Sequence, residues 1–328
     1  MRRAVALSHA VLGSTSPNPP VGAVALDEAG AVVGLGATEP PGGRHAERVA
    51  LDQAQGRAYT VVSTLEPCNH TGRTGPCALA LLDAGVRRVV IACADPTETA
   101  GGGVQTLRNA GVEVLTDVLQ AEVAAGPLAP WLYVQRAGRP FVTWKYAATL
   151  DGRSAALDGT SRWITGEAAR SEVHQLRGQV DAVIVGSGTV LADDPELTTR
   201  PDPGHQPLRV VVDGRARVPA TAKVLDAQAP TLHVTSEQGP VDLAALLKDL
   251  AGMGIVHALL EGGPTLAAAF LKADLVDEIR AYLAPALLGS GLSAVGDLGI
   301  ATIDDTLRLH VTDARRVGDD VRITLRRH

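Results

Sequence analysis

The chain has 328 residues, of which 45% are hydrophobic and 3% aromatic, and its formal net charge is −6. This length exceeds what one hydrophobic core usually supports, so two domains are expected. The acidic balance and the scarcity of aromatic side chains argue against a nucleic-acid surface, which needs basic patches and stacking platforms. Three cysteines and the lack of a membrane-length apolar run predict a reducing, cytoplasmic location without disulfides.

Helix and strand patterns alternate along the first part of the chain. A helix near 2–12 is expected to lead through a proline-rich turn into a hairpin of two strands. The expected strands are 21–26, 31–36, 58–64, 86–92 and 112–115, and the expected helices are 45–55, a helix that opens at Cys77 and ends at Gly85, and 104–109. The stretch 126–140 indicates the approach to a domain boundary.

The most informative residues lie between positions 45 and 77. They are His45-Ala46-Glu47, then Cys68 and Cys77, each cysteine preceded by proline. Three such ligands hold Zn²⁺ and leave its fourth position open for water. Glu47 is then the general acid/base that moves a proton to a leaving amine. Base deaminases carry this signature, H-x-E followed by P-C-x-x-C, although here eight residues separate the cysteines.

Two other interpretations of these residues are less favoured. The histidine and cysteines could be unrelated core and surface residues, but their order matches the deaminase signature. A purely structural zinc site needs a fourth protein ligand, and the remaining cysteine, Cys93, follows an apolar run that predicts a buried strand.

The segment between the two cysteines is polar, with two glycines and one cation. We expect it to form the rim of the pocket and to place His70 and Arg73 near the substrate. A cation at this place favours an anionic substituent on the base, such as a phosphate.

The alternating pattern starts again after Pro140. The expected strands are 141–147, 182–186, 208–212, 231–235, 255–261 and 278–283, followed by the 311–325 region, and the expected helices are 167–177, 243–250 and 265–272. The run 260–266 joins a strand to a helix through two glycines, which suits a phosphate but equally a plain turn. Arg215 is either a second phosphate ligand or an exposed turn residue. These features indicate a nucleotide-binding α/β domain.

A resemblance to a known family rests on motifs spread over nearly the whole chain. They lie at 17–23, 45–47, 66–77, Lys145, 149–152, 161–165, 190–195 and 261–265. Together they resemble the bifunctional riboflavin-biosynthesis family, which joins a diaminohydroxyphosphoribosylaminopyrimidine deaminase to a 5-amino-6-(5-phosphoribosylamino)uracil reductase. The resemblance implies an α/β chain with a cytidine-deaminase-like three-layer domain over 1–137. A dihydrofolate-reductase-like α/β domain is implied over 138–328.

The same resemblance implies roles for individual residues. Zinc would be bound by His45, Cys68 and Cys77, with Glu47 as the catalytic proton carrier. The implied substrate contacts are Asn18, His70, Arg73, Ser161, Arg177, Leu197, Arg200 and Glu261. The implied NADPH contacts are Ala147, Trp163, Thr189, Asp193, Gly214, Gly263, Pro264, Thr265, Leu266, Ala267, Ala268 and Ala269. For Trp163 the alternative is core packing.

Some positions depart from the family pattern, namely Thr38, where histidine is common, Gly75, and the stretch 97–100. None removes a catalytic group. The expected function is zinc-dependent deamination of the phosphorylated diaminopyrimidine followed by NADPH reduction of its ribose, in an enzyme that we expect to be a homo-oligomer. One alternative is a nucleoside or tRNA-base zinc deaminase fused to an unrelated NADPH oxidoreductase. A second alternative is a non-catalytic zinc-binding module that senses a nucleotide.

Overall fold

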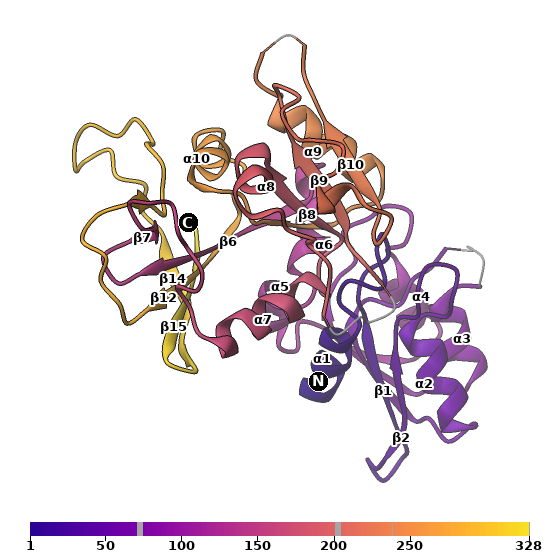
Figure 1. Cartoon of the computed structure of the whole chain (residues 1–328). Helices are drawn as coiled ribbons and strands as arrows, with labels where there is room; N and C mark the ends of the chain where they lie inside the picture. The colour runs from indigo at the N-terminus through magenta and orange to yellow at the C-terminus, as the bar shows by residue number, and fades with distance from the viewer. Residues whose placement is uncertain (71–74, 201–204, 238, 328) are drawn as a thin grey trace. The chain divides into compact units, whose positions relative to one another are not determined.

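The computed structural model describes residues 1–70, 75–200, 205–237 and 239–327. It divides into two compact units, Met1–Gly138 and Arg139–His328 (Figure 1). Among the described residues, no helix is both long and apolar enough to cross a membrane.

The first unit is built on a five-stranded sheet in the order β2-β1-β3-β4-β5. β1 pairs antiparallel with β2 and β3, whereas β3, β4 and β5 run parallel. The strands are β1 (Gly22–Leu26), β2 (Val32–Ala37), β3 (Thr60–Leu65), β4 (Arg88–Cys93) and β5 (Glu113–Leu115). The helices are α1 (Arg2–Ala10), α2 (Ala46–Ala54), α3 (Cys77–Asp83), α4 (Gly103–Asn109), α5 (Gln120–Ala125) and α6 (Ala129–Ala137).

Glycines in the sheet allow two helices to lie directly on its faces. A Cβ atom on Gly36 or Gly34 of β2 would lie 2.0 or 2.1 Å from a carbonyl oxygen of α2. A Cβ on Gly22 would lie 2.0 Å from a carbonyl of α1, and the β1–β2 register puts Gly22 and Gly36 on opposite faces. The unit therefore has three layers, and the close approach of α2 brings His45 and Glu47 against the sheet.

The segment expected to be a boundary is more structured than the sequence suggested. α6 occupies most of it and α5 ends directly before it, because a proline in the first turn of α6 is compatible with a helix. Gly138 ends α6 in the left-handed conformation, and the division between the units follows directly after it.

The second unit contains an eight-stranded sheet in the order β10-β9-β8-β11-β6-β12-β15-β14. Neighbouring strands from β10 to β12 are parallel, and β15 and β14 complete one edge as an antiparallel hairpin. These strands are β6 (Phe141–Thr149), β8 (Ala182–Gly186), β9 (Leu208–Val212), β10 (Thr231–Val234), β11 (His257–Leu260), β12 (Glu278–Ala284), β14 (His310–Val317) and β15 (Asp320–Arg326). A separate pair is formed by β7 (Arg153–Ala155) and β13 (Leu292–Ser293).

Helices cover both faces of this sheet. One core contains apolar side chains of α9 (Leu243–Gly252) and α10 (Pro264–Lys272) against the sheet. The opposite core contains Leu176 of α7 (Glu167–Arg177) and Val190 of α8 (Ser187–Asp193). The alternation along β8, with Ile184 in the first core and Val183 in the second, places them on opposite faces. The short α8 and the 3-10 turn η1 (Lys223–Leu225) were not among the expected elements.

Candidate functional sites

Three metal-ligating side chains meet in the first unit. His45 is the residue before α2, Cys77 opens α3, and Cys68 lies in the loop after β3. The His45 Nδ1 atom is 3.5 Å from Cys68 Sγ and 3.3 Å from Cys77 Sγ. Zinc–ligand bonds of about 2.0–2.3 Å place tetrahedral ligands roughly 3.6 Å apart. The cluster therefore fits a zinc ion, held by the three predicted residues.

The two thiols share a hydrogen bond that prepares them for a metal. Contact with Cys77, helped by His45, lowers the pKa of Cys68 to about 4. The same contact, together with burial, raises the pKa of Cys77. One thiolate thus forms readily, and a bound metal would displace the proton of the other.

Glu47 lies beside this cluster on the first turn of α2. Its side chain is buried, and the Ser63 hydroxyl on β3 donates to Glu47 Oε1 over 3.2 Å. Burial raises the pKa of Glu47, which suits a carboxyl that alternately accepts and gives up a proton near neutral pH. The arrangement can therefore carry out proton transfer next to a metal.

Glu66 has a positioning role that its motif did not reveal. Its carboxylate accepts the backbone N–H groups of Gly102 and Val104 at 3.1 and 2.9 Å, and that of Asp95 at 3.1 Å. The negative charge also lies at the start of α4, where a helix favours it. Glu66 thereby fixes the 95–104 loop against the segment that carries Cys68.

The remaining predicted residues of the first unit are placed differently. Asn18 lies in the turn before β1, and His70 is exposed. Arg73 lies outside the described residues. Thr38, one of the departures from the family pattern, ties β1 to β2 because its hydroxyl accepts the N–H of Val21 over 3.1 Å. Their substrate roles stay predictions.

The second unit contains a cavity of about 1390 Å³ at the carboxyl ends of the parallel strands, the usual ligand site in such sheets. All predicted substrate residues of this unit line the cavity, namely Ser161, Arg177, Leu197, Arg200 and Glu261. So do the predicted cofactor residues Ala147, Trp163, Thr189, Asp193, Gly214, Gly263, Pro264, Thr265, Leu266 and Ala269. Ala267 and Ala268 instead lie buried in the core behind it.

A partly buried ionic group lies at the base of this cavity. Strand register puts Leu260 opposite Trp144, so Glu261 follows beside Lys145, whose Nζ is 4.0 Å from Glu261 Oε2. Arg177, the last residue of α7, donates to both carboxylate oxygens of Glu261 over 2.6 and 3.0 Å. Although burial opposes ionisation, the Arg177 guanidinium holds the pKa of Glu261 at about 2. Burial lowers the pKa of Lys145.

The cofactor end of the cavity has the features of a dinucleotide site. The Gly263 N–H that precedes α10 donates to Thr189 Oγ1 of α8 over 3.0 Å, so the N-termini of both helices meet there. Gly188 has open space where a Cβ would lie, and Arg217 reaches the same place through Ser187 Oγ at 2.9 Å. Backbone N–H groups, small residues and cations fit the phosphates of NADPH.

Trp163 is 69% exposed, so the alternative of core packing is wrong. Its ring lies under the Arg170 guanidinium, 4.5 Å from the ring centroid. The neighbouring Arg162 donates to the carbonyl of Asp193 over 2.8 Å and links the two predicted cofactor residues. A large aromatic face is thereby presented to the cavity.

Family models match both units. Residues 1–93 match the cytidine and deoxycytidylate deaminase zinc-binding region, and residues 140–323 match the RibD C-terminal domain. The riboflavin biosynthesis protein RibD of Mycobacterium tuberculosis is 50% identical over 99% of this chain and 96% of its own length. That of Aquifex aeolicus is 40% identical over 100% of this chain and 98% of its own.

Solved structures agree over the full length. Acinetobacter baumannii RibD has a TM-score of 0.91 at 38% identity, covering 99% of this chain and 97% of that one. A Thermotoga maritima protein, described as a diaminohydroxyphosphoribosylaminopyrimidine deaminase/5-amino-6-(5-phosphoribosylamino)uracil reductase, has a TM-score of 0.93 at 33% identity, covering 100% and 97%.

Fold, sites and comparisons together define a bifunctional enzyme, with a cytidine-deaminase-like unit that binds zinc and a reductase unit that uses NADPH. The chain belongs to the RibD family of riboflavin biosynthesis proteins. The predicted fold class, activity and cofactors are confirmed, and the alternative of a nucleoside or tRNA-base deaminase fused to an unrelated oxidoreductase is not favoured.

Replacing Cys77 with serine should abolish stoichiometric zinc binding, because a hydroxyl does not supply the thiolate ligand. Metal analysis of the purified protein should give about one zinc per wild-type chain and far less for the variant. Cys93→Ser is the matched control, since Cys93 is buried in β4 outside the cluster. Full zinc content in Cys77→Ser would remove Cys77 from the ligand set.

Proposed function

We propose that the first unit deaminates 2,5-diamino-6-(5-phosphoribosylamino)pyrimidin-4(3H)-one. The second unit then reduces the ribose with NADPH to give 5-amino-6-(5-phosphoribitylamino)uracil. The observation that carries the proposal is the buried Glu47 beside the His45, Cys68 and Cys77 cluster. A non-catalytic zinc sensor has no need of a buried proton carrier at that position.

In deamination, zinc when bound supplies Lewis-acid activation of a water molecule. Glu47 accepts a proton from the water and delivers it to the departing amino nitrogen, so ammonia leaves and a carbonyl takes its place. Ser63 keeps the carboxylate oriented by its hydrogen bond. We propose that Asn18 contacts the pyrimidine, and that His70 and Arg73 contact the ribose phosphate.

In reduction, NADPH supplies the hydride. The ribosylamine opens to an imine, whose carbon accepts the hydride while its nitrogen takes a proton. Lys145 is suited to deliver that proton because it is a half-buried ammonium at the base of the cavity, next to Glu261, and burial lowers its pKa. Arg177 and Glu261 hold substrate hydroxyls, Ser161 and Leu197 contact its body, and Arg200 attracts its phosphate. Arg215 and Arg217, which line the cofactor end, would hold the 2′-phosphate of NADPH.

Replacing Glu47 with glutamine should keep zinc bound but lower the deamination rate by about 10²–10⁴-fold, the usual contribution of general acid/base catalysis. Ammonia release and zinc content are measured on the same sample. Glu122→Gln, at an exposed position of the same unit, serves as the control. Reduction of pre-deaminated substrate should stay at the wild-type rate, and loss of zinc in Glu47→Gln would contradict the assignment.

The division of labour between 1–137 and 138–328 is also proposed, and the compact units of the structure support it. A fragment of residues 138–328 should fold and oxidise NADPH when given the deaminated ribosylamino-pyrimidine, because every cavity residue lies within it. A strong chelator should leave this activity intact while it stops deamination by the whole chain. A folded fragment that is inactive, or that needs zinc, would refute the division. The ratio of NADPH to NADH oxidation tests the roles of Arg215 and Arg217.

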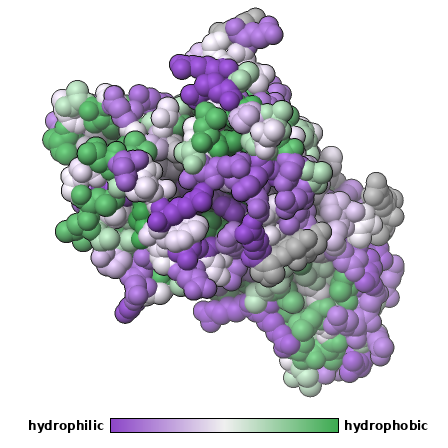
Figure 2. Space-filling model, viewed as in Figure 1, coloured by the Kyte–Doolittle hydropathy of each residue, from purple (hydrophilic) through white to green (hydrophobic). Residues whose placement is uncertain are grey.

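We further propose that the enzyme is a homo-oligomer. Leu157, Leu287 and Ile303 of the second unit are 84%, 73% and 77% exposed. Figure 2 shows green, hydrophobic residues at its left, on the side where Figure 1 places β7 and the yellow loops that precede β14. The pairing of β7 with β13 brings the loops that bear Leu157 and Leu287 to the same place. Such a patch is typical of a subunit interface.

The double variant Leu157→Ser/Leu287→Ser should therefore lower the sedimentation mass toward that of a monomer, because it removes apolar area from the interface. Met253→Ser is the control, since Met253 is 58% exposed and directly follows the C-terminal end of α9. A wild-type monomer would end the proposal.

A cytoplasmic location and the absence of nucleic-acid partners are likewise proposals. The first is supported by the need for reduced Cys68 and Cys77, and the second by the net charge of −6. Cell fractionation and a nucleic-acid binding assay would check them.

A further inference from the structure

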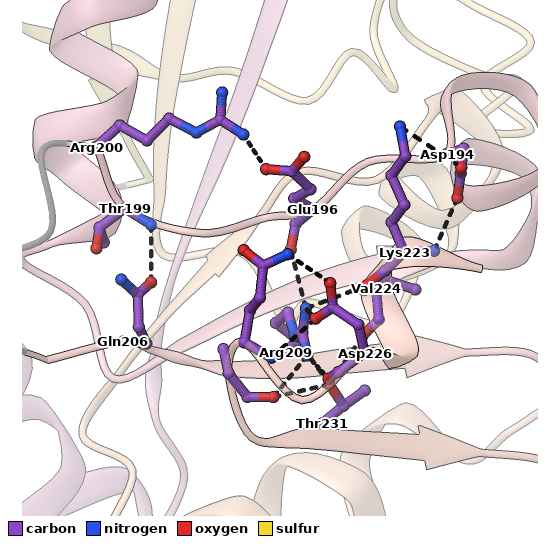
Figure 3. A network of polar contacts seen from close by, with 12 residues as sticks. Asp194, Glu196, Thr199, Arg200, Gln206, Arg209, Lys223, Val224, Asp226 and Thr231 are labelled. Atoms are coloured by element: carbon purple, nitrogen blue, oxygen red, sulfur yellow. Dashed lines mark hydrogen bonds and ion pairs between the residues drawn. The ribbon is translucent and has the colours of Figure 1, made fainter. Parts of the chain in front are cut away.

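Arg209 in β9 is a cation that is fully buried. Such a charge is tolerated only if its N–H groups are paired. Its Nε donates to Thr231 Oγ1 over 2.8 Å, and its Nη1 donates to Asp226 Oδ1 over 3.0 Å and to the carbonyl of Glu196 over 3.2 Å (Figure 3). Nη2 donates to the carbonyls of Asp226 and Ala229. A single carboxylate, that of Asp226, compensates the charge. The planar fork of the guanidinium fixes the positions of the uncharged oxygen partners.

These partners come from two parts of the chain. Most lie between η1 and β10, while Glu196 belongs to residues 194–200, which we call the 194–200 segment. Two further bonds tie this segment down. Asp194 Oδ1 accepts the N–H of Lys223 over 2.9 Å, and the N–H of Thr199 donates to Gln206 Oε1 over 2.8 Å (Figure 3).

The 194–200 segment has a conformation that its own sequence does not favour. Leu197 has a φ of 56°, in the left-handed region that side chains with a Cβ seldom adopt. The Leu197 side chain is buried in the core that contains Val211 and Val224. The carbonyl of Thr198 accepts a hydrogen bond from Arg177 Nη1 over 3.3 Å. The segment therefore connects the Arg209 cluster with the Arg177–Glu261 pair at the base of the cavity.

We propose that Arg209 is a positioning residue for the reduction step. By holding the Glu196 carbonyl it sets where Leu197 and Arg200 meet the substrate. The inference rests on the proposed function, in which Leu197 and Arg200 contact the substrate. Arg209 is itself buried and does not line the cavity, so it acts on the substrate through the segment; its Nη1 also donates to the carbonyl of Lys223 over 3.4 Å. Lysine cannot replace it, because one ammonium group does not reproduce the fork.

The test is the steady-state reduction of the deaminated ribosylamino-pyrimidine by full-length Arg209→Lys. The KM for the pyrimidine should rise about tenfold or more, with kcat changed by less than about threefold, as expected for misplaced binding groups. Deamination by the same chains should be unchanged and serves as an internal control.

Arg139→Lys is the matched control. Arg139 is another largely buried arginine of this unit, bonded to both carboxylate oxygens of Asp277 at 2.8 and 3.0 Å. Its loss should lower the melting temperature and leave the KM for the pyrimidine unchanged. An equal rise of KM in both variants would mean that general loosening of the fold, not positioning, is responsible.

Gln206→Leu provides a second variant in case Arg209→Lys does not fold. Gln206 is half-buried outside the cavity lining, and its loss releases the Thr199 N–H. It should raise the same KM, by less than Arg209→Lys. Unchanged KM in the folded variants would overturn the inference. Arg200→Ala distinguishes failure of the positioning role from failure of the proposed function. If Arg200→Ala raises the KM and Arg209→Lys does not, only the positioning role of Arg209 is refuted. If Arg200→Ala has no effect on the KM, the proposed contact of Arg200 with the substrate is refuted as well.

Discussion

The Arg177 guanidinium binds the Glu261 carboxylate through Nε and Nη2, and both side chains are largely buried at the cavity wall. A buried carboxylate would otherwise take up a proton, so its ionised form depends on this partner. Lys145 forms an ion pair with Glu261, and Arg177 also donates a hydrogen bond to the Thr198 carbonyl. Strands β6 and β11, the C-terminal end of α7 and the 194–200 segment therefore all meet at the Arg177–Glu261 ion pair.

The deaminase unit accommodates its buried carboxyl groups in a different way. The Glu66 carboxylate accepts helix and loop N–H groups, which orders the backbone next to Cys68. For Glu47, which accepts the Ser63 hydroxyl, the effect of burial outweighs its hydrogen bonds and raises its pKa. The first carboxylate thus stabilises the loop. The second is left able to change state, as a proton carrier must be.

Much of this could be predicted from the sequence because the signals are local. The expected strands of both sheets and most helices are present, since alternation and capping patterns act between near neighbours. The zinc ligands followed from residue type and order. α6 and α8 were missed because short helices that begin next to proline or glycine resemble turns, and α5 was missed because it has only six residues and ends at a glycine. Ala267 and Ala268 shared a motif with cavity residues, yet helix periodicity turns their side chains toward the core.

The sequence by itself determined the chemistry that the chain can perform: a thiolate and imidazole metal site, a carboxyl proton carrier, and a glycine-rich cofactor end. Only the tertiary structure decided which distant side chains meet. Lys145 faces Glu261 because β6 and β11 are neighbours in one particular register, and Arg209 reaches Glu196 because the 194–200 segment lies within hydrogen-bonding distance of β9. The tertiary structure also decided that Trp163 is exposed and not packed in the core. Such contacts join residues far apart in the chain, and strand order and register fix them rather than any local pattern.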